Sequence, residues 1–325
     1  MNDDLLRLEK LRIDIHAARG TAAVVDDVSL AVAAGRVTAL VGESGCGKSM
    51  TALAVPRLLP AAACCVGGRI HFDGRDLRVM PEEELRRVRG RRIGMVFQEP
   101  MAALNPLMTI GRQVAEAIEL HAGVRPREAA RRAVQKLAEV ALSDPQRVAR
   151  QYPHQLSGGM RQRAMIAVAL AGDPDLIIAD EPTTALDATI QAQILELLCA
   201  VTRQRGRALL LITHDFGVVS AVADDVAVMY AGRIVERGPA AQVLARPRHP
   251  YTAALLRCVP RLRGPRVALP VIPGAPPAPF AWPGGCRYHP RCALASDDAR
   301  CRHEQPTDVS VGADHVAACW KTENT

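Results

Sequence analysis

Aromatic residues are scarce in this sequence, and their absence from particular segments limits what the chain can bind. Phe, Trp and Tyr make up 3% of the 325 residues, and the first of them along the chain is Phe72. None lies among the arginines of residues 86–92, so this basic run lacks the stacking platform that single-stranded nucleic acids use. Because three glutamates precede the run at residues 82–84, we predict a short solvated helix with acids at its start and bases at its end.

Long apolar runs are also missing. No stretch approaches the roughly 18 residues of a membrane-spanning helix, and residues 1–6 lack the pattern of a secretory signal. We therefore expect a cytosolic chain, with any transmembrane path on another polypeptide. The formal net charge of +7 resides mainly in residues 246–325, where eleven Lys and Arg stand against six Asp and Glu. The rest of the chain is nearly neutral, so we expect no nucleic-acid partner.

What the sequence does contain is a glycine loop suited to phosphate. Residues 42–49, GESGCGKS, lie between an apolar run at residues 36–41, predicted to be a buried strand, and a predicted helix start at residues 50–54. Glycines let several backbone N–H groups converge on a phosphate chain, Lys48 adds a positive charge, and the Ser49 hydroxyl is a ligand for Mg²⁺. By itself the loop would also suit a kinase, a GTPase or a helicase. The predicted ATP-binding residues are Gly42, Glu43, Ser44, Gly45, Cys46, Gly47, Lys48 and Ser49.

Two adjacent carboxylates follow a second apolar run. Residues 176–179 predict a central strand that ends in Asp180 and Glu181. Asp180 can hold a metal-bound water, and Glu181 can orient and deprotonate the water that attacks the γ-phosphate. The alternative, in which both acids only cap the turn before Pro182, loses weight because a phosphate loop precedes them.

Two further polar side chains follow strand-like runs. Residues 208–212 lead to His214, which can donate a hydrogen bond to a γ-phosphate oxygen. Residues 93–97 lead to Gln98, whose amide can reach both Mg²⁺ and the water. Each of these two side chains is assigned to the nucleotide site because the glycine loop and the adjacent carboxylates occur in the same chain.

A second predicted helix start distinguishes the candidate classes. Ser157 is a good N-cap, and Gly158 and Gly159 follow it before a predicted helix at residues 160–171. This is another helix end built for anions in a chain whose glycine loop already serves the phosphates. At this point the chain resembles the ATP-binding subunits of ABC transporters, in which this segment reaches across a dimer to the nucleotide of the opposite subunit.

The resemblance rests on the order and spacing of five segments and implies a role for each. It implies an α/β fold: a P-loop ATPase core with a RecA-like sheet, an N-terminal antiparallel β part and a helical subdomain at about residues 99–165. The core would span residues 1–245, with a C-terminal extension at residues 246–325. The implied roles are Mg²⁺ binding by Ser49, Gln98 and Asp180, catalysis by Glu181, His214 and Gln98, a signature at Ser157, Gly158 and Gly159, and a D-loop at Ala185, Leu186 and Asp187.

One departure from the family pattern is visible. Members usually place an aromatic residue about twenty residues before the phosphate loop, where it stacks on adenine. Here that region offers only His16 and Arg19. Either side chain would stack on adenine less effectively than an aromatic ring, so this region does not itself predict a preference for ATP over GTP.

The composition changes after residue 245. Twelve of the 23 prolines lie in the last eighty residues, and residues 270–283 are nearly a polyproline stretch that cannot prolong a sheet. Four cysteines follow within 34 residues, in a segment with little apolar core of its own. Because cytosolic thiols stay reduced, a soft-metal site is more plausible than disulfides. The cysteines are Cys286, Cys292, Cys301 and Cys319.

The extension narrows the resemblance to the oligopeptide, dipeptide and nickel permease group. The segment HPYTAALL at residues 249–256, the proline stretch and the spacing C-x5-C-x8-C-x17-C resemble the C-terminal region of that group's ATP-binding subunits. Members can hold a 4Fe-4S cluster on these cysteines, and the resemblance implies one here. Structural zinc and no metal stay open as alternatives.

We therefore expect the ATPase subunit of a di- or oligopeptide importer, peripheral at the cytoplasmic face of the inner membrane. The resemblance implies a second, homologous ATPase in a heterodimer, two transmembrane permease subunits and an extracytoplasmic substrate-binding protein. An importer of nickel or another small solute is the near alternative, because the cargo never touches this chain. A soluble ABC ATPase acting on nucleic acid or ribosomes is the distant one.

Overall fold

The structure is a computed structural model that describes residues 4–184, 186–259, 270–295 and 298–322. The chain forms two compact units. The first consists of Met1–Leu6, Val32–Val37 and Asp73–Ile212, and the second of Arg7–Ala31, Thr38–Phe72 and Thr213–Thr325. The second unit contains residues on both sides of residue 245.

Parallel strands form the sheet of the first unit. β6 (Ile93–Val96) pairs with β7 (Leu176–Asp180), which pairs with β8 (Ala208–Thr213). Every residue of β7 and β8 is buried, as expected of parallel strands covered on both faces. The three strands predicted from apolar runs in this part of the chain are confirmed.

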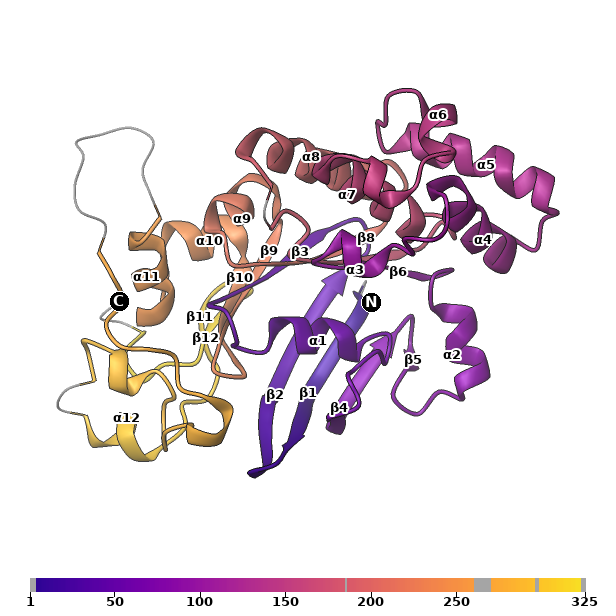
Figure 1. Ribbon diagram of the computed structural model, residues 1–325. Coiled ribbons are helices and arrows are strands. Elements are labelled where there is room, and N and C mark those ends of the chain that lie inside the picture. The colour runs from indigo at the N-terminus through magenta and orange to yellow at the C-terminus, as the bar shows by residue number, and fades with distance from the viewer. Residues whose placement is uncertain (1–3, 185, 260–269, 296–297, 323–325) are drawn as a thin grey trace. The chain divides into compact units, whose positions relative to one another are not determined.

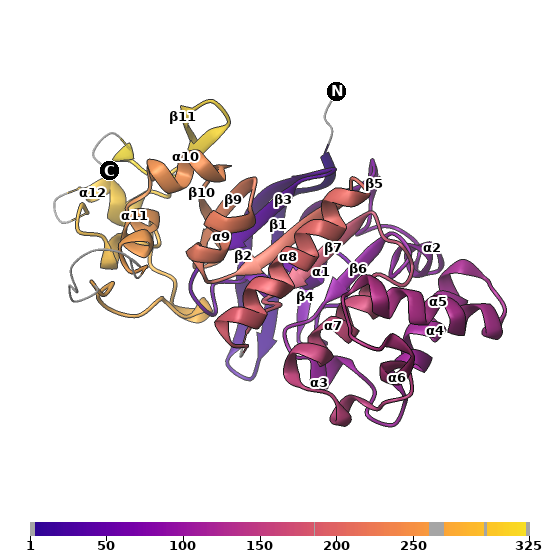
Figure 2. The same cartoon turned by 90° about the horizontal axis from the view of Figure 1, so that it is seen from above.

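Most helices lie in the first unit. In Figure 2, α4, α5, α6 and α7 gather into one group, and the contacts among them agree. This group corresponds to the helical subdomain expected from the resemblance. The elements are β5 (Arg75–Asp76), α2 (Glu82–Val88), α3 (Pro100–Ala103), α4 (Ile110–Ala122), α5 (Pro126–Glu139), α6 (Pro145–Ala149), the 3-10 turn η1 (Pro153–Gln155), α7 (Gly158–Ala169) and α8 (Ala188–Gln204).

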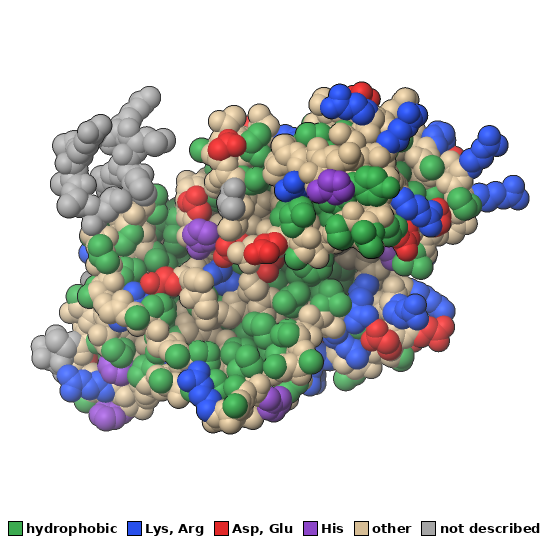
Figure 3. Space-filling view, viewed as in Figure 1, with side chains coloured by type: hydrophobic (Ala, Val, Ile, Leu, Met, Phe, Trp, Pro, Cys, Tyr) green, Lys and Arg blue, Asp and Glu red, His purple; other side chains and the backbone are tan. Residues whose placement is uncertain are grey.

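The predicted acid-to-base helix is α2. Glu82, Glu83 and Glu84 occupy its first turn, and Arg86 and Arg87 its last. Several of its charges are paired, as in the 3.1 Å contact between Arg87 and Glu83. In the space-filling view, acidic side chains lie among the basic ones over α2 and over α5 (Figure 3). The first two arginines of the basic run therefore belong to a solvated helix, and the other three lie at or beyond its end.

The second unit contains a mixed sheet and an N-terminal sheet. In the mixed sheet β3 (Val37–Val41) runs parallel to β9 (Asp225–Tyr230), and β9 is antiparallel to β10 (Arg233–Pro239). The N-terminal sheet has the order β2, β1, β4, and a two-residue turn joins its first two strands. Its strands are β1 (Asp4–Ala17), β2 (Gly20–Ala33) and β4 (Ala63–Phe72). The chain thus has the α/β class and the N-terminal β part that the sequence predicts.

The C-terminal residues are integrated into the second unit (Figure 1). β12 (His315–Ala317) pairs with β10 and β11 (Val309–Gly312) pairs with β12, so these residues prolong the sheet. The proline stretch itself contributes no strand among its described residues, as predicted, but the residues after it do. The remaining elements of this unit are α1 (Lys48–Ala54), α9 (Phe216–Val222), α10 (Ala240–Ala245), α11 (Pro250–Arg257), the 3-10 turns η2 (Pro279–Ala281) and η3 (His289–Arg291), and α12 (Ala299–His303).

The extension shares an apolar core with the mixed sheet. Tyr230, Tyr251 and Tyr288 pack together at its centre, with ring centroids 4.5 to 5.2 Å apart. Trp282 and Cys292 pack against the same core. The expectation that this segment has little apolar core of its own is correct, because it uses the core of the strands beside it.

Candidate nucleotide site

The glycine loop has the predicted context, since β3 ends at Val41 and α1 begins at Lys48. Gly45 and Gly47 have φ angles of +77° and +109°, which side-chain-bearing residues rarely adopt. A Cβ atom on Gly42 would lie 2.2 Å from the Met229 carbonyl oxygen. These glycines are therefore required by the loop's backbone shape and by the close approach of Met229.

Lys48 is held inside the loop that it would serve. Its Nζ donates hydrogen bonds to the carbonyl oxygens of Gly42 at 2.9 Å and Glu43 at 3.0 Å. The residue is 4% exposed, and these two hydrogen bonds hold the ammonium group against its own loop. From this position the ammonium group can bind phosphate oxygens when they occupy the loop.

Glu43, the second residue of the loop, is bound by the C-terminal extension. Its backbone N–H donates to the Tyr251 hydroxyl at 3.0 Å, and its carboxylate receives two bonds from Arg291, at 2.7 and 3.0 Å. Glu43 keeps the pKa of Arg291 above its ordinary value although burial acts in the opposite direction. No sequence pattern indicates either contact, because both partners are more than 200 residues away.

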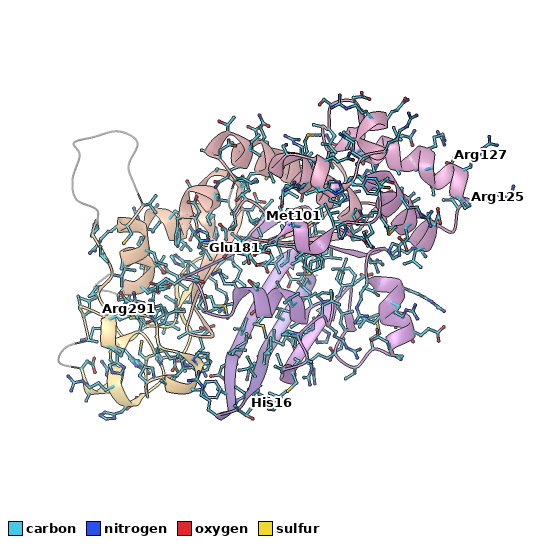
Figure 4. The ribbon with its side chains drawn as sticks, viewed as in Figure 1. His16, Met101, Arg125, Arg127, Glu181 and Arg291 are labelled. Carbon is cyan, nitrogen blue, oxygen red and sulfur yellow. The ribbon has the colours of Figure 1, made fainter. Side chains whose placement is uncertain are left out.

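In the first unit, the strand register brings the expected catalytic carboxylates and Gln98 to one edge. Val96 of β6 lies beside Ala179 of β7, so Gln98 and Glu181 both follow the carboxyl ends of neighbouring parallel strands. Asp180 is buried at 6% exposure. Figure 4 shows Glu181 at this strand end.

Glu181 has an unusual backbone for a residue with a side chain. Its φ is +44°, its N–H donates to the Ile212 carbonyl at 3.0 Å, and its Oε2 accepts a hydrogen bond from the Thr184 hydroxyl at 3.0 Å. Left-handed backbone at a polar residue concentrates at functional sites, where the surrounding structure maintains it. The carboxylate is thus oriented by its neighbours rather than free in a turn.

His214 follows the last residue of β8 and is exposed. The next residue, Asp215, caps α9 by accepting a hydrogen bond from the Gly217 N–H at 2.7 Å. Thr213 accepts a hydrogen bond from the Asp215 N–H at 3.0 Å. The predicted strand-end position of the histidine is confirmed.

The predicted signature opens α7. Ser157 is the N-cap, and its hydroxyl accepts a hydrogen bond from the Met160 N–H at 3.4 Å, as expected from sequence. The helix begins at Gly158, two residues earlier than predicted. A Cβ on Gly159 would lie 2.9 Å from the Ile190 side chain in α8. The signature therefore packs on the start of α8, whose N-cap is Asp187; Ala185 of the expected D-loop lies outside the described residues.

Similarity to known proteins decides between the candidate families. A family model described as ABC transporter matches residues 25–184, and one described as oligopeptide/dipeptide transporter, C-terminal region, matches residues 235–301. A probable peptide ABC transporter ATP-binding protein of Sinorhizobium fredii is 47% identical over 322 residues, which cover 98% of this chain and 96% of that protein. The chain belongs to the ABC transporter family.

Other relatives of this ABC ATPase agree. A putative peptide import ATP-binding protein of Brucella abortus is 47% identical over 315 residues, covering 97% of this chain and 94% of that protein. A dimeric ATP-binding cassette solved in a post-hydrolysis state with ADP and phosphate is similar in structure, with a TM-score of 0.65 and 27% identity. The match covers 72% of this chain and 98% of that one. Among the described residues no helix is both long and apolar enough to cross a membrane.

The two residues expected in place of the family's adenine-stacking aromatic have other partners. His16, at the end of β1, contacts the Thr21 hydroxyl through Nδ1 at 2.8 Å and Cys64 through Nε2 at 3.4 Å (Figure 4). The guanidinium carbon of Arg19 lies 4.1 Å from the ring centroid of Phe280. An aromatic ring does therefore lie beside this hairpin, but it comes from the extension, where sequence spacing could not indicate it.

The four cysteines of the extension come together around one narrow pocket, which His249 also lines. Burial raises the pKa of Cys286 and of Cys319 to about 11, and the neighbouring thiols contribute in the same direction. In the part of the chain that the structure describes, no three His, Cys, Asp or Glu side chains form a ligand set for a metal ion. The expected 4Fe-4S or zinc set is thus not assembled here, although its four cysteines are neighbours.

Proposed function

We propose that this ABC ATPase energises the import of di- and oligopeptides through a membrane transporter. The observation that supports this best is similarity over nearly the whole chain, at 47% identity, to proteins named for peptide import. The matched C-terminal region is the one described for oligopeptide and dipeptide transporters. Import of nickel or another small solute is the second candidate, because the same group includes it and this chain does not touch the cargo.

Uptake in living cells tests the substrate. Cells in which this gene carries Lys48→Ala are expected to lose uptake of a radiolabelled dipeptide, and the wild-type gene restores it. Dipeptide uptake that persists in the variant, with loss of radioactive nickel uptake instead, would replace the peptide assignment by the second candidate.

The arrangement within each unit supports a role for each site residue. We assign phosphate binding to residues 42–49, Mg²⁺ binding to Ser49, Gln98 and Asp180, and activation of the attacking water to Glu181. When bound, Mg²⁺ would neutralise charge on the phosphate oxygens. His214 would donate a hydrogen bond to the γ-phosphate. The oriented carboxylate of Glu181 supports its part in this scheme.

Replacing Glu181 by Gln tests the assigned base. The amide keeps the shape of the side chain but cannot accept the proton of water, so steady-state ATP hydrolysis should fall by at least about a hundredfold. ATP binding, measured with a fluorescent nucleotide, should persist and stabilise a dimer detectable by size-exclusion chromatography. Hydrolysis at the wild-type rate would assign the base elsewhere.

The same proposal includes partners and a location. We infer that two ATPase domains close face to face on ATP, with a homologous but different ATPase as the second, at the cytoplasmic face of the inner membrane. Two transmembrane permeases would receive the motion, and an extracytoplasmic binding protein would deliver substrate. Exposed apolar side chains after β6 support a docking surface there: Phe97, Met101 and Leu107 are 37%, 48% and 86% exposed.

We further propose that the four extension cysteines hold a soft metal centre, a 4Fe-4S cluster in first place and zinc in second. Four thiols around one pocket suit either metal. His249 Nε2, buried without a hydrogen-bond partner, belongs to a residue that lines the same pocket. When bound, the centre would cross-link segments that are distant in sequence. Residues 246–325 would then form a braced extension of a nucleotide-binding domain at residues 1–245.

Metal analysis tests this centre directly. Protein purified anaerobically without chelators should contain about four iron and four labile sulfide ions per chain and absorb visible light as iron–sulfur proteins do. Cys292→Ser should lose most of the iron. Stoichiometric zinc in a colourless protein would identify the alternative metal, and protein free of both would contradict the centre.

A further inference from the structure

The phosphate loop contains an acidic side chain in an unfavourable place. Glu43 directly follows Gly42, in a loop whose backbone N–H groups converge on phosphate, so its carboxylate adds negative charge where the ligand is itself anionic. Like charges held close together in a partly desolvated site repel one another. A loop containing this residue therefore needs a compensating positive charge.

Arg291 supplies that charge from the extension. Its side chain is 5% exposed, and both terminal nitrogens contact the Glu43 carboxylate, at 2.7 and 3.0 Å. Bidentate arginine–carboxylate pairs fix geometry as well as charge. The positive charge that compensates the Glu43 carboxylate is therefore already in place in the folded protein.

The arginine is itself held on several sides. Its Nε donates to the Pro273 carbonyl at 2.9 Å, and its Nη1 lies 3.4 Å from the Tyr230 hydroxyl. It ends η3, in the segment that leads into Cys292 (Figure 4). The guanidinium thus has a fixed position relative to the core of the second unit.

The backbone of Glu43 is fixed from the same direction. Its N–H is engaged by the hydroxyl of Tyr251, a fully buried residue of α11. His249 caps that helix by accepting a hydrogen bond from the Tyr251 N–H at 3.1 Å, and its own N–H donates to the buried Glu236 at 3.0 Å. The His-Pro-Tyr segment therefore aims the tyrosine at the phosphate loop.

We propose that Arg291 is a positioning residue for nucleotide binding, which acts through Glu43: it neutralises the Glu43 carboxylate and holds the start of the phosphate loop in its binding conformation. The extension is then a functional part of the nucleotide site. This inference rests on the assignment of residues 42–49 as the phosphate loop.

The test separates compensation of charge from mere packing. Arg291→Met should weaken binding of a fluorescent, non-hydrolysable ATP analogue about tenfold, within the range of coupling between contacting residues. Glu43→Gln gives the reference affinity of a loop that lacks this charge. The double variant should bind like Glu43→Gln alone, because removing the arginine matters only while the glutamate is charged. In steady-state ATPase assays over a range of ATP concentrations, Arg291→Met should raise the KM for ATP by a larger factor than it lowers kcat.

Arg237→Met is the matched control. It removes another ion pair between a strand of this unit and the extension, the 2.6 Å contact with Asp308, at a place without contact to the loop. Its nucleotide affinity should stay within about twofold of wild type. If Arg291→Met cannot be purified, Arg291→Lys, alone and combined with Glu43→Gln, gives the same comparison with a smaller loss.

Three results would overturn the proposal: unchanged affinity in Arg291→Met, a double variant as weak as Arg291→Met alone, or an equal loss in Arg237→Met. The second would show that the arginine only supports folding. Lys48→Ala tests the underlying assignment separately, since retained nucleotide binding in that variant would remove the phosphate loop itself from residues 42–49, whatever Arg291 does.

Discussion

At the scale of single residues, a few charged side chains in this ABC ATPase fix segments that are far apart in sequence. Asp173 is an example in the first unit. Its φ is +54°, and its Oδ1 accepts hydrogen bonds from Lys136 at 2.7 Å and Arg207 at 3.0 Å. Both cations are at least nine-tenths buried. One carboxylate therefore compensates two charges that the surrounding protein could not leave unpaired.

Replacing Asp173 by Asn should lower the free energy of unfolding by about 2 kcal/mol. Asparagine tolerates the left-handed backbone, so the loss would come from the buried cations, reduced because Asp173 itself is half exposed. Urea unfolding measures the difference. Asp175→Asn is the control, since its partner Arg92 is more exposed and the expected loss is below about 1 kcal/mol.

The Asp173 carboxylate should also make the free energy of unfolding depend on pH, in a direction that its pKa shift determines. Burial alone would raise the pKa of Asp173, but the hydrogen bond and charge of Lys136, with the two nearby arginines, lower it below the ordinary 3.8. Its stabilisation is therefore complete above about pH 4 and declines as the pH falls further. The gap in stability between wild type and Asp173→Asn should narrow on acidification, and a gap that widened would contradict this account.

At the scale of elements, helix starts in the first unit place functional segments. Ser157 begins α7 and Asp187 begins α8, each by accepting hydrogen bonds from backbone N–H groups of the first turn. Gly158 lies near Leu186, and Gly159 near Ile190. The two glycines assigned to the signature thus lie against residues at the start of α8.

Asp187→Ala should cost about 1 kcal/mol of stability, because the N–H groups of Thr189 and Ile190 lose their acceptor. Asp187→Asn keeps an acceptor oxygen and should stay within about 0.5 kcal/mol of wild type. Thermal and urea unfolding of both variants provide the measurement. Equal losses would show that charge at this helix start matters more than the hydrogen bonds.

Predictions at this scale succeeded where local pattern and tertiary packing agree. The strands at residues 176–179 and 208–212 are predicted from their apolar runs. The spacing of Val134, Leu137, Ala138 and Ala141 likewise predicts a helix at residues 127–142, with these four residues on one face. For that helix, α5, the predicted apolar face included Ala138 and Ala141, but both are exposed, and Ala129 and Ala133 are buried instead. Because α5 has small side chains on two sides, its sequence alone does not show which side is buried against the neighbouring helices.

At the scale of the whole molecule, the central proposal is that one protomer completes the nucleotide site of its partner. Mixed dimers test it with two inactivating changes, Ser157→Arg in the signature and Lys48→Ala in the phosphate loop. With the changes on different protomers, a shared arrangement leaves one complete site. With both changes on the same protomer, it leaves none.

The test uses dimers of this chain alone, expressed without the second ATPase: differently tagged copies allow both combinations to be purified and their ATPase rates compared. The dimer with one change on each protomer should retain about half of the hydrolysis per wild-type dimer, or less if the sites are coupled. The dimer with both changes on one protomer should be inactive. The reverse order of activity would mean that each protomer has a self-contained site.

The chemistry of this protein was evident from the sequence because it depends on local patterns. A glycine loop between a strand and a helix, carboxylates at a strand end and a capped helix start are each written in a few consecutive residues, and the structure placed each in the predicted element. Their order sufficed to indicate the family that the comparisons then showed.

Only the tertiary structure decided how the extension is attached to the rest of the second unit. Residues far apart in the chain meet in three places. β12 pairs with β10, Arg291 and Tyr251 hydrogen-bond to Glu43, and Phe280 lies beside Arg19. Such contacts depend on how the chain folds, and no periodic pattern in the sequence indicates them. A local pattern can specify a strand or a cap, but which distant charge compensates Glu43 is determined only when the second unit has packed.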